Sequence, residues 1–181
     1  MRPSWHEYFM LIAKVVATRS TCNSRPIGAV IVKNNRILAT GYNGAIPKAT
    51  HCTSLLMGKE PFCMRRYMKA EEHSKMDYCV AVHAEANAVA QAAKMGISID
   101  GASIYCTVSP CYSCFKLLAS AGIKEIYYEY LYESKDKKRD KYWEEQIKKS
   151  GIHISQVIIT DRSLKYMLDM ISGITSKRRI D

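Results

Sequence analysis

The chain has 181 residues, of which 48% are hydrophobic and 24% charged, and its formal net charge is +10 at pH 7. This length and balance indicate one globular domain with a real hydrophobic core. No apolar run approaches the roughly 18 residues of a membrane span, and the charged N-terminal residues are untypical of a signal peptide. Seven cysteines, an odd number, argue against a secreted disulfide framework, so we expect a reducing cytoplasm. The positive charge suits nucleic acid or a phosphorylated small molecule.

The first part of the chain predicts a helix followed by a hairpin. Apolar residues at helical spacing predict a helix over residues 4–18, with Ser4 as its N-cap. Two β-branched runs, 27–32 and 36–42, predict strands. Asn34 and Asn35 between them predict a tight turn, because asparagine tolerates left-handed backbone angles. Residues 44–80 show little periodicity, and such a stretch inside a compact domain is usually functional or tied down.

The second part alternates between helices and strands. The expected helices are 84–95, 111–121, 142–149 and 163–171, and the expected strands are 103–108, 124–130 and 152–159. Alternation after a leading hairpin predicts an α/β protein whose mixed sheet is covered by helices on both faces. Two lysine-rich runs, 135–141 and 177–179, are expected to be solvated surface away from the residues that carry chemistry.

One histidine and two cysteines stand at the spacing of a catalytic zinc site. His83 is followed 28 positions later by Cys111, then by Cys114, and a proline precedes the cysteine pair. One imidazole and two thiolates leave the fourth position of a tetrahedral zinc open for water. Glu85 lies two residues past the histidine, where it can handle protons. The pattern H-x-E followed by P-C-x-x-C is the signature of zinc-dependent nucleobase deaminases.

This motif predicts a hydrolytic deamination. The two expected helices begin near His83 and Cys111, and the N-terminus of a helix stabilises thiolates and anionic oxygen. Zinc lowers the pKa of its water to about 7, and Glu85 would carry the water's proton to the ring nitrogen and then to the leaving amine. A structural zinc knuckle is the weaker interpretation, because such sites normally use four protein ligands. A redox pair of Cys111 and Cys114 would leave His83 unexplained.

The residues around the motif resemble the cytidine and deoxycytidylate deaminase family. The resemblance is carried by residues 83–88 (HAEANA) and 109–114 (SPCYSC), and residues 41–44 (GYNG) are similar to its deoxycytidylate branch. Residues 2–5 (RPSW) and 17–22 (ATRSTC) are similar to bacterial members, including those encoded in competence operons. The resemblance implies a three-layer α/β/α cytidine-deaminase-like fold with a mixed five-stranded sheet. It covers a catalytic domain over 1–151, and we expect 152–181 to be a strand and helix extension packed on the same domain.

The resemblance also implies an activity and an assembly. The implied reaction is zinc-dependent deamination of dCMP to dUMP and ammonia, which supplies thymidylate synthesis, by a cytoplasmic homo-hexamer without membrane partners. Activation by dCTP with Mg2+ is a further implication. A deaminase acting on cytosine or adenine in nucleic acid is the alternative that the net charge keeps open. A non-catalytic zinc-binding partner module is another, against which the presence of Glu85 argues.

Contacts with the base and sugar follow from the same resemblance. Asn43 would hydrogen-bond the deoxyribose, and the backbone at Ala84 and Ser109 would read the cytosine edge. Tyr132 matches a tyrosine that closes over the substrate. The plainer interpretations are that Asn43 holds a turn and that Tyr132 is one of twelve ordinary tyrosines.

The phosphate of a nucleotide needs cations. Arg25, in the loop before the first expected strand, is the first candidate, and Lys94, near the end of the helix that follows His83, is the second. A viral member has arginine at the position of Lys94, and lysine lacks the bidentate fork of arginine. Either residue could instead be ordinary surface.

Several cysteines remain after the catalytic site is assigned. The resemblance implies a second, structural zinc held by Cys22, Cys52, His73 and Cys79. A closed four-ligand site would order residues 44–80. Cys63 could replace His73 as a ligand, and the alternative is that these cysteines are buried free thiols. Cys106 lies within an expected strand and is predicted to belong to the core.

Overall fold

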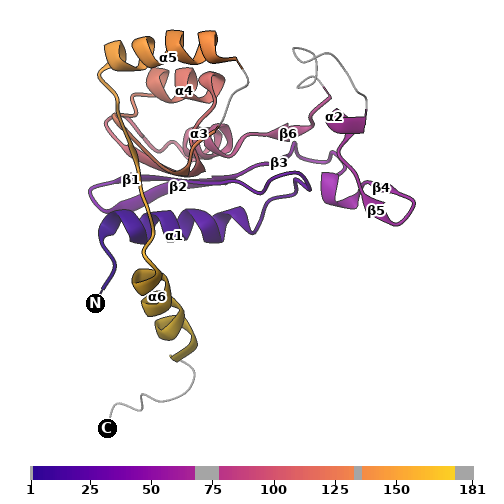
Figure 1. Ribbon diagram of the computed structural model, residues 1–181, viewed down its shortest axis with the longest axis horizontal. Coiled ribbons are helices and arrows are strands. Elements are labelled where there is room, and N and C mark those ends of the chain that lie inside the picture. Colours follow the sequence, from indigo (N-terminus) through magenta and orange to yellow (C-terminus); the bar gives the residue numbers. More distant parts are fainter. Residues whose placement is uncertain (1, 68–77, 133–135, 174–181) are drawn as a thin grey trace.

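A five-stranded mixed sheet forms the centre of the computed structural model, which describes residues 2–67, 78–132 and 136–173 (Figure 1). The strands lie in the order β2-β1-β7-β8-β9, with bounds β1 Gly28–Lys33, β2 Arg36–Tyr42, β7 Ser103–Val108, β8 Glu125–Tyr130 and β9 His153–Gln156. Strand β1 pairs antiparallel with β2 and β7, while the β7–β8 and β8–β9 pairs are parallel. The predicted mixed sheet is therefore confirmed.

Helices cover both faces of this sheet, as predicted. Helix α1 (Trp5–Ala17) lies on one face, and helices α3 (Ala84–Lys94), α4 (Tyr112–Ser120) and α5 (Lys137–Ser150) lie on the other (Figure 1). Strand β1 shows why both faces need cover, because its side chains alternate between two cores. Ala29 and Ile31 pack with α3 and α4, and Val30 and Val32 pack with α1.

The N-terminal helix and the hairpin form where the sequence predicts them. Ser4 caps α1 through a reciprocal capping box with Glu7. Asn34 and Asn35 have φ values of 52° and 57°, the left-handed angles that a two-residue hairpin turn requires. These local signals account for α1 and for the β1–β2 hairpin.

Glycine allows α3 to approach the sheet closely. A Cβ atom on Gly41 of β2 would lie 2.1 Å from the carbonyl oxygen of Ala84 and 2.4 Å from the backbone nitrogen of Ala88. Both alanines are fully buried. The first turn of α3 is therefore held against the end of β2 by backbone contact, with no room for a side chain between them.

Helix α5 differs from its predicted bounds. It begins five residues before the predicted residue 142, because Asp136 caps it by accepting a hydrogen bond from the backbone of Arg139. Only Trp143 and Ile147 of this polar helix pack against the core. The spacing of apolar residues therefore predicted that the helix begins near residue 142, after its true first residue. The helix brings Lys137 and Lys141 beside the cysteine motif, and the prediction that these lysines lie away from it is wrong. The run at 177–179 lies outside the described residues.

The segment 44–80 contains only short elements in its described part. These are β3 (Gly44–Ala45), a 3-10 helix η1 (Cys52–Ser54), β4 (Leu56–Met57), β5 (Glu60–Pro61) and α2 (Met64–Tyr67). Strand β3 pairs antiparallel with β6 (Ala81–Val82), so that Gly44 lies opposite Val82. This pairing ties the end of the β2 strand to the residue that precedes His83.

The C-terminal strand and helix are less buried than the rest. Strand β9 adds to the sheet edge but is shorter than the predicted 152–159, because the chain turns toward the start of α1, where Thr160 donates hydrogen bonds to Glu7. Helix α6 (Asp161–Gly173) then extends away from the sheet, and Ser163 is its one buried residue (Figure 1). In the described parts of the chain, no helix is both long and apolar enough to cross a membrane.

The link between α1 and α6 predicts a pH-dependent stability. Hydrogen bonds from Ser163, Ser4 and Thr160 lower the pKa of Glu7 from 4.5 to about 2. Because this folded-state pKa lies below the unfolded value, the stabilisation is present above pH 4.5 and is lost as the pH falls toward 2. We expect Glu7→Gln to lower the free energy of unfolding at pH 7 by about 0.5–1 kcal/mol, since solvent screens these contacts.

The measurement is thermal or denaturant unfolding of both proteins between pH 7 and pH 2.5, with Glu145→Gln on the exposed side of α5 as the matched control. The difference between wild type and Glu7→Gln should shrink below pH 4.5. A difference that stays constant with pH would contradict the role of the Glu7 charge.

Candidate active site

Two helix N-termini meet at the end of the sheet and bring the three predicted metal ligands together. Strand β6 leads into His83, which is the N-cap of α3, and β7 leads through two residues into Cys111, the N-cap of α4. Cys114 lies in the first turn of α4. The prediction that His83 and Cys111 stand at helix starts is confirmed.

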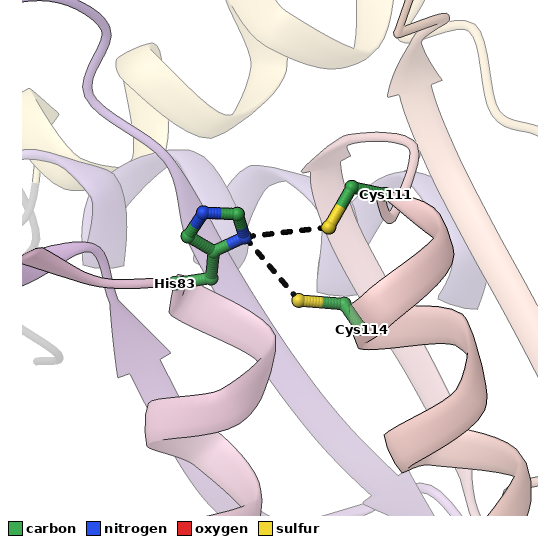
Figure 2. A group of neighbouring side chains, drawn as sticks. All are labelled: His83, Cys111 and Cys114. Carbon is green, nitrogen blue, oxygen red and sulfur yellow. Dashed lines mark hydrogen bonds between the residues drawn. The ribbon is translucent and has the colours of Figure 1, made fainter. Parts of the chain in front are cut away.

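The three ligand atoms have the spacing of a tetrahedral zinc site. Nδ1 of His83 lies 3.5 Å from Sγ of Cys111 and 3.4 Å from Sγ of Cys114 (Figure 2). With Zn–S bonds of about 2.3 Å and Zn–N bonds of about 2.0–2.1 Å, tetrahedral geometry separates nitrogen from sulfur by about 3.5 Å. Among the described residues, this is the one group of three or more such ligands whose atoms all lie within 4.8 Å of one another. The residues therefore fit zinc without rearrangement.

The protonation of the two thiols is unequal. A hydrogen bond from the Cys114 thiol, together with the neighbouring His83 ring, lowers the pKa of Cys111 to about 4. The same hydrogen bond and burial raise the pKa of Cys114. Contact with Cys111 raises the pKa of His83. Because zinc binds two thiolates and a neutral imidazole, metal binding must release the protons shared within this group.

Glu85 is a buried carboxyl group beside the ligands. It is 4% exposed, and burial raises its pKa, while contacts with His83 and with the thiol of Cys114 oppose that rise. A carboxyl group whose pKa is raised toward neutrality exchanges protons more readily at physiological pH. This is the environment that a general acid–base residue requires.

His83, Cys111 and Glu85 line a cavity of about 350 Å³, which lies within the range of small-molecule sites. Five further residues predicted from the sequence line the same cavity: Arg25, Asn43, Ala84, Ser109 and Tyr132. Lys94 does not, because it is the last residue of the eleven-residue helix α3 and lies about 15 Å along the helix from the cavity end.

Asn43 organises the loop at the cavity wall. Its side-chain oxygen accepts hydrogen bonds from the Ser20 hydroxyl and the Ile27 backbone at 2.7 and 2.8 Å, and its amide nitrogen donates to the Arg25 carbonyl at 2.8 Å. The interpretation that Asn43 holds a turn is consistent with these contacts. The same bonds keep the amide at the cavity and fix the backbone of Arg25.

Ser109 joins the cavity to the strand beside it. Its backbone N–H donates to the carbonyl of Tyr130 at 2.8 Å, and its hydroxyl accepts a hydrogen bond from the backbone of Tyr132 at 2.7 Å. The Tyr132 side chain is 47% exposed and lines the cavity. The backbone of Tyr132 is therefore fixed, while about half of its side chain is exposed to solvent.

Sequence reasoning missed two cations of this site. Arg65 and Arg66, on the short helix α2, line the cavity with Arg25. They fall in the irregular segment 44–80, where no periodic pattern indicated which side chains face inward. Two adjacent arginines between two cysteines were the available signal.

Four further cysteines line the same cavity: Cys22, Cys52, Cys63 and Cys79. Burial raises the pKa of Cys52, and the other three thiols raise it further. His73 lies outside the described residues. Cys106 is fully buried in β7, as predicted.

A mixed α/β sheet that holds a His-Cys-Cys metal site and a buried glutamate at two helix starts defines a zinc-dependent deaminase. Comparison with known proteins agrees. Residues 3–130 match the family described as the cytidine and deoxycytidylate deaminase zinc-binding region. The chain belongs to this family.

Three similar proteins place the chain within the family. The chain is 36% identical to ComE operon protein 2 of Bacillus subtilis over 97% of its own length and 85% of that protein. It is 41% identical to the deoxycytidylate deaminase of Mycobacterium phage D29 over 70% of its length and 95% of the phage protein. A crystal structure of the dCMP deaminase from cyanophage S-TIM5 in complex with dCMP and dUMP superposes with a TM-score of 0.62 and 31% identity, covering 87% of this chain and 99% of the other.

The site geometry separates the residues that hold zinc from the one that moves protons. We expect His83→Ala and Cys111→Ala to lose the catalytic zinc along with turnover. Glu85→Gln should keep that zinc but lose about 10²- to 10⁴-fold in kcat, the usual contribution of a general acid–base group. Zinc content and turnover are measured on each purified variant.

The matched controls are His153→Ala, an exposed histidine on β9, and Glu145→Gln on α5. Both should resemble wild type in metal and activity. Loss of zinc in Glu85→Gln, or nearly full activity in that variant, would contradict the assigned roles.

Proposed function

We propose that this chain hydrolyses dCMP to dUMP and ammonia as a zinc-dependent deoxycytidylate deaminase. The observation that carries the proposal is the burial of Glu85 in one cavity with His83 and Cys111, and the third ligand, Cys114, lies within 3.4 Å of His83. Membership of the family supports the chemistry. Similarity to a dCMP deaminase whose structure contains dCMP and dUMP supports the substrate.

The residues of the cavity suit the steps of this reaction. When bound, zinc supplies a water whose pKa is lowered into the neutral range. Glu85 would accept one proton of that water and deliver it to N3 of the cytosine ring as the water oxygen bonds to C4. It would then take the second proton from the hydroxyl on C4 and give it to the amine, which leaves as ammonia when the C4–N bond breaks. Burial favours this shuttle because it raises the pKa of Glu85.

The backbone is assigned to the cytosine edge. The Ala84 N–H is in the first turn of α3, where an amide has no partner within the helix, and it would donate to the cytosine carbonyl. The Ser109 N–H is already bonded to Tyr130, so the Ser109 carbonyl is the group assigned to the exocyclic amine.

The sugar and phosphate are assigned to the cavity mouth. An amide nitrogen carries two hydrogens, so Asn43 has one beyond its bond to Arg25 for a deoxyribose hydroxyl. Tyr132 would cover the nucleotide, and Arg25 would bind its phosphate. Lys94 has no part in this arrangement within one chain.

A second, structural zinc is part of the proposal. Its support is that Cys22, Cys52, Cys63 and Cys79 line one cavity. The described sulfur atoms are farther apart than those of the catalytic site, and His73 remains the alternative to Cys63 as the fourth ligand. Such a site would join the loop before β1 to the segment 44–80.

Assembly, regulation and domain limits rest on the family resemblance alone. We extend the proposal to a cytoplasmic homo-hexamer activated by dCTP with Mg2+. In the same way, 1–151 is proposed as the catalytic domain and 152–181 as its extension.

The first test concerns the substrate. Purified, zinc-loaded protein should deaminate dCMP at least about 100-fold more efficiently than deoxycytidine, since the phosphate adds charge-assisted contacts. A cytosine-containing DNA strand is the third substrate, because Lys137 and Lys141 near the motif keep nucleic acid as a competing target. Ammonia release from the three substrates is compared, with Glu85→Gln as the inactive control. Equal efficiency on dCMP and deoxycytidine, or turnover of the strand alone, would exclude the proposed substrate.

The second test concerns the number of zinc ions. Wild type should contain two per chain, and Cys22→Ser should contain one and unfold at a lower temperature. Parallel variants Cys63→Ser and His73→Ala identify the fourth ligand, because only the true ligand lowers the metal content. One zinc per chain in wild type, with Cys22→Ser unchanged, would leave these cysteines as free thiols.

A further inference from the structure

Three arginines gather at one side of the catalytic cavity. Arg25 comes from the loop before β1, while Arg65 and Arg66 come from α2, about forty residues later in the chain. Glu85 is the one acidic side chain among the described residues that line this cavity. Among the described residues that line the cavity, the three arginines are the basic side chains that stay charged at neutral pH.

Hydrogen bonds hold the two arginine-bearing segments together. Nη2 of Arg66 donates to the Ser24 hydroxyl at 2.7 Å. Ser24 directly precedes Arg25, whose carbonyl oxygen is bonded to Asn43. The exposed Arg66 side chain is thus anchored to the same loop that carries Arg25, and both of these exposed arginines line the cavity.

Arg65 is less exposed than the other two arginines. It is half-buried, whereas Arg25 and Arg66 are exposed, and it lines the same cavity as His83. The three arginines therefore share one cavity with the catalytic histidine.

We propose that Arg65 and Arg66, with Arg25, form the subsite for the 5′-phosphate monoester of the nucleotide. This inference rests on the proposed function and assigns residues to the phosphate that the sequence did not indicate. Guanidinium groups bind phosphate oxygens in bidentate pairs. Arg66 is the residue on which the subsite depends most, because its hydrogen bond to Ser24 fixes its position before the substrate binds.

The distribution of charge also orients the ligand. A phosphate is attracted by the arginines, so a nucleotide would bind with its phosphate at the arginine side and its base toward His83 and Cys111. A nucleoside has no group for the arginine side. Preference for a nucleotide over its nucleoside therefore comes from the segment 44–80 and the loop before β1 together.

The test separates phosphate binding from chemistry. In the full-length, zinc-loaded chain, Arg66→Ala should raise the KM for dCMP by about 10- to 100-fold with kcat little changed, as expected for lost charge-assisted hydrogen bonds. Turnover of deoxycytidine should be unaffected. Arg66→Lys should fall between the two, and Arg36→Ala, an exposed arginine on β2, is the matched control. An unchanged KM for dCMP in Arg66→Ala would overturn the subsite.

A binding measurement makes the result independent of turnover. Calorimetry should show that wild type binds dUMP at least 10-fold more tightly than deoxyuridine, and that Arg66→Ala loses this difference while zinc content stays the same. Failure of wild type to deaminate dCMP would reject the proposed function, yet retained, Arg66-dependent binding of dUMP would still support the subsite. Equal binding of dUMP and deoxyuridine by wild type would overturn it. So would equally tight, Arg66-dependent binding of a cytosine-containing DNA strand, because the arginines would then serve a phosphodiester.

Discussion

Helix α3 lies against strand β2 so closely at Gly41 that the two backbones touch, and this contact positions the first turn of the helix. That turn contains both His83 and Glu85. The partner helix α4 reaches the same place because β7 lies next to β1 in the sheet and ends at the residues before Cys111. The positions of the metal ligands thus depend on backbone packing, which brings Nδ1 of His83 to 3.4 to 3.5 Å from the two cysteine sulfur atoms.

Burial then divides the labour within the cavity. The carboxyl group of Glu85 is enclosed, which raises its pKa, whereas Arg25 and Arg66 remain exposed to solvent. A desolvated group can exchange protons, and a solvated cation can capture a charged ligand without paying a large desolvation cost. The same cavity therefore combines a buried carboxyl group for chemistry with solvent-exposed arginines for recognition of the ligand.

The predictable parts of this structure are those with a local signal. Ser4, the Asn34–Asn35 turn and the metal motif were each indicated by a few neighbouring residues, and the sheet followed from alternation. The start of α5 was not, because its first turn is polar and is set by the Asp136 cap. Arg66 was missed for a different reason: its orientation depends on a hydrogen bond to Ser24, a contact that no local pattern encodes. The placement of the described part of segment 44–80 depends on contacts with residues that are distant in the sequence.

The cavity wall is drawn from segments scattered over most of the chain, including Ser24, Asn43, Arg66, Glu85 and Tyr132. Bringing such distant segments together costs chain entropy that local hairpins and helices do not. Helix α1 and the first hairpin can form from neighbouring residues, but the cavity exists only once the whole sheet is assembled. Secondary structure can therefore be present in this chain before activity is, and turnover reports completion of the fold.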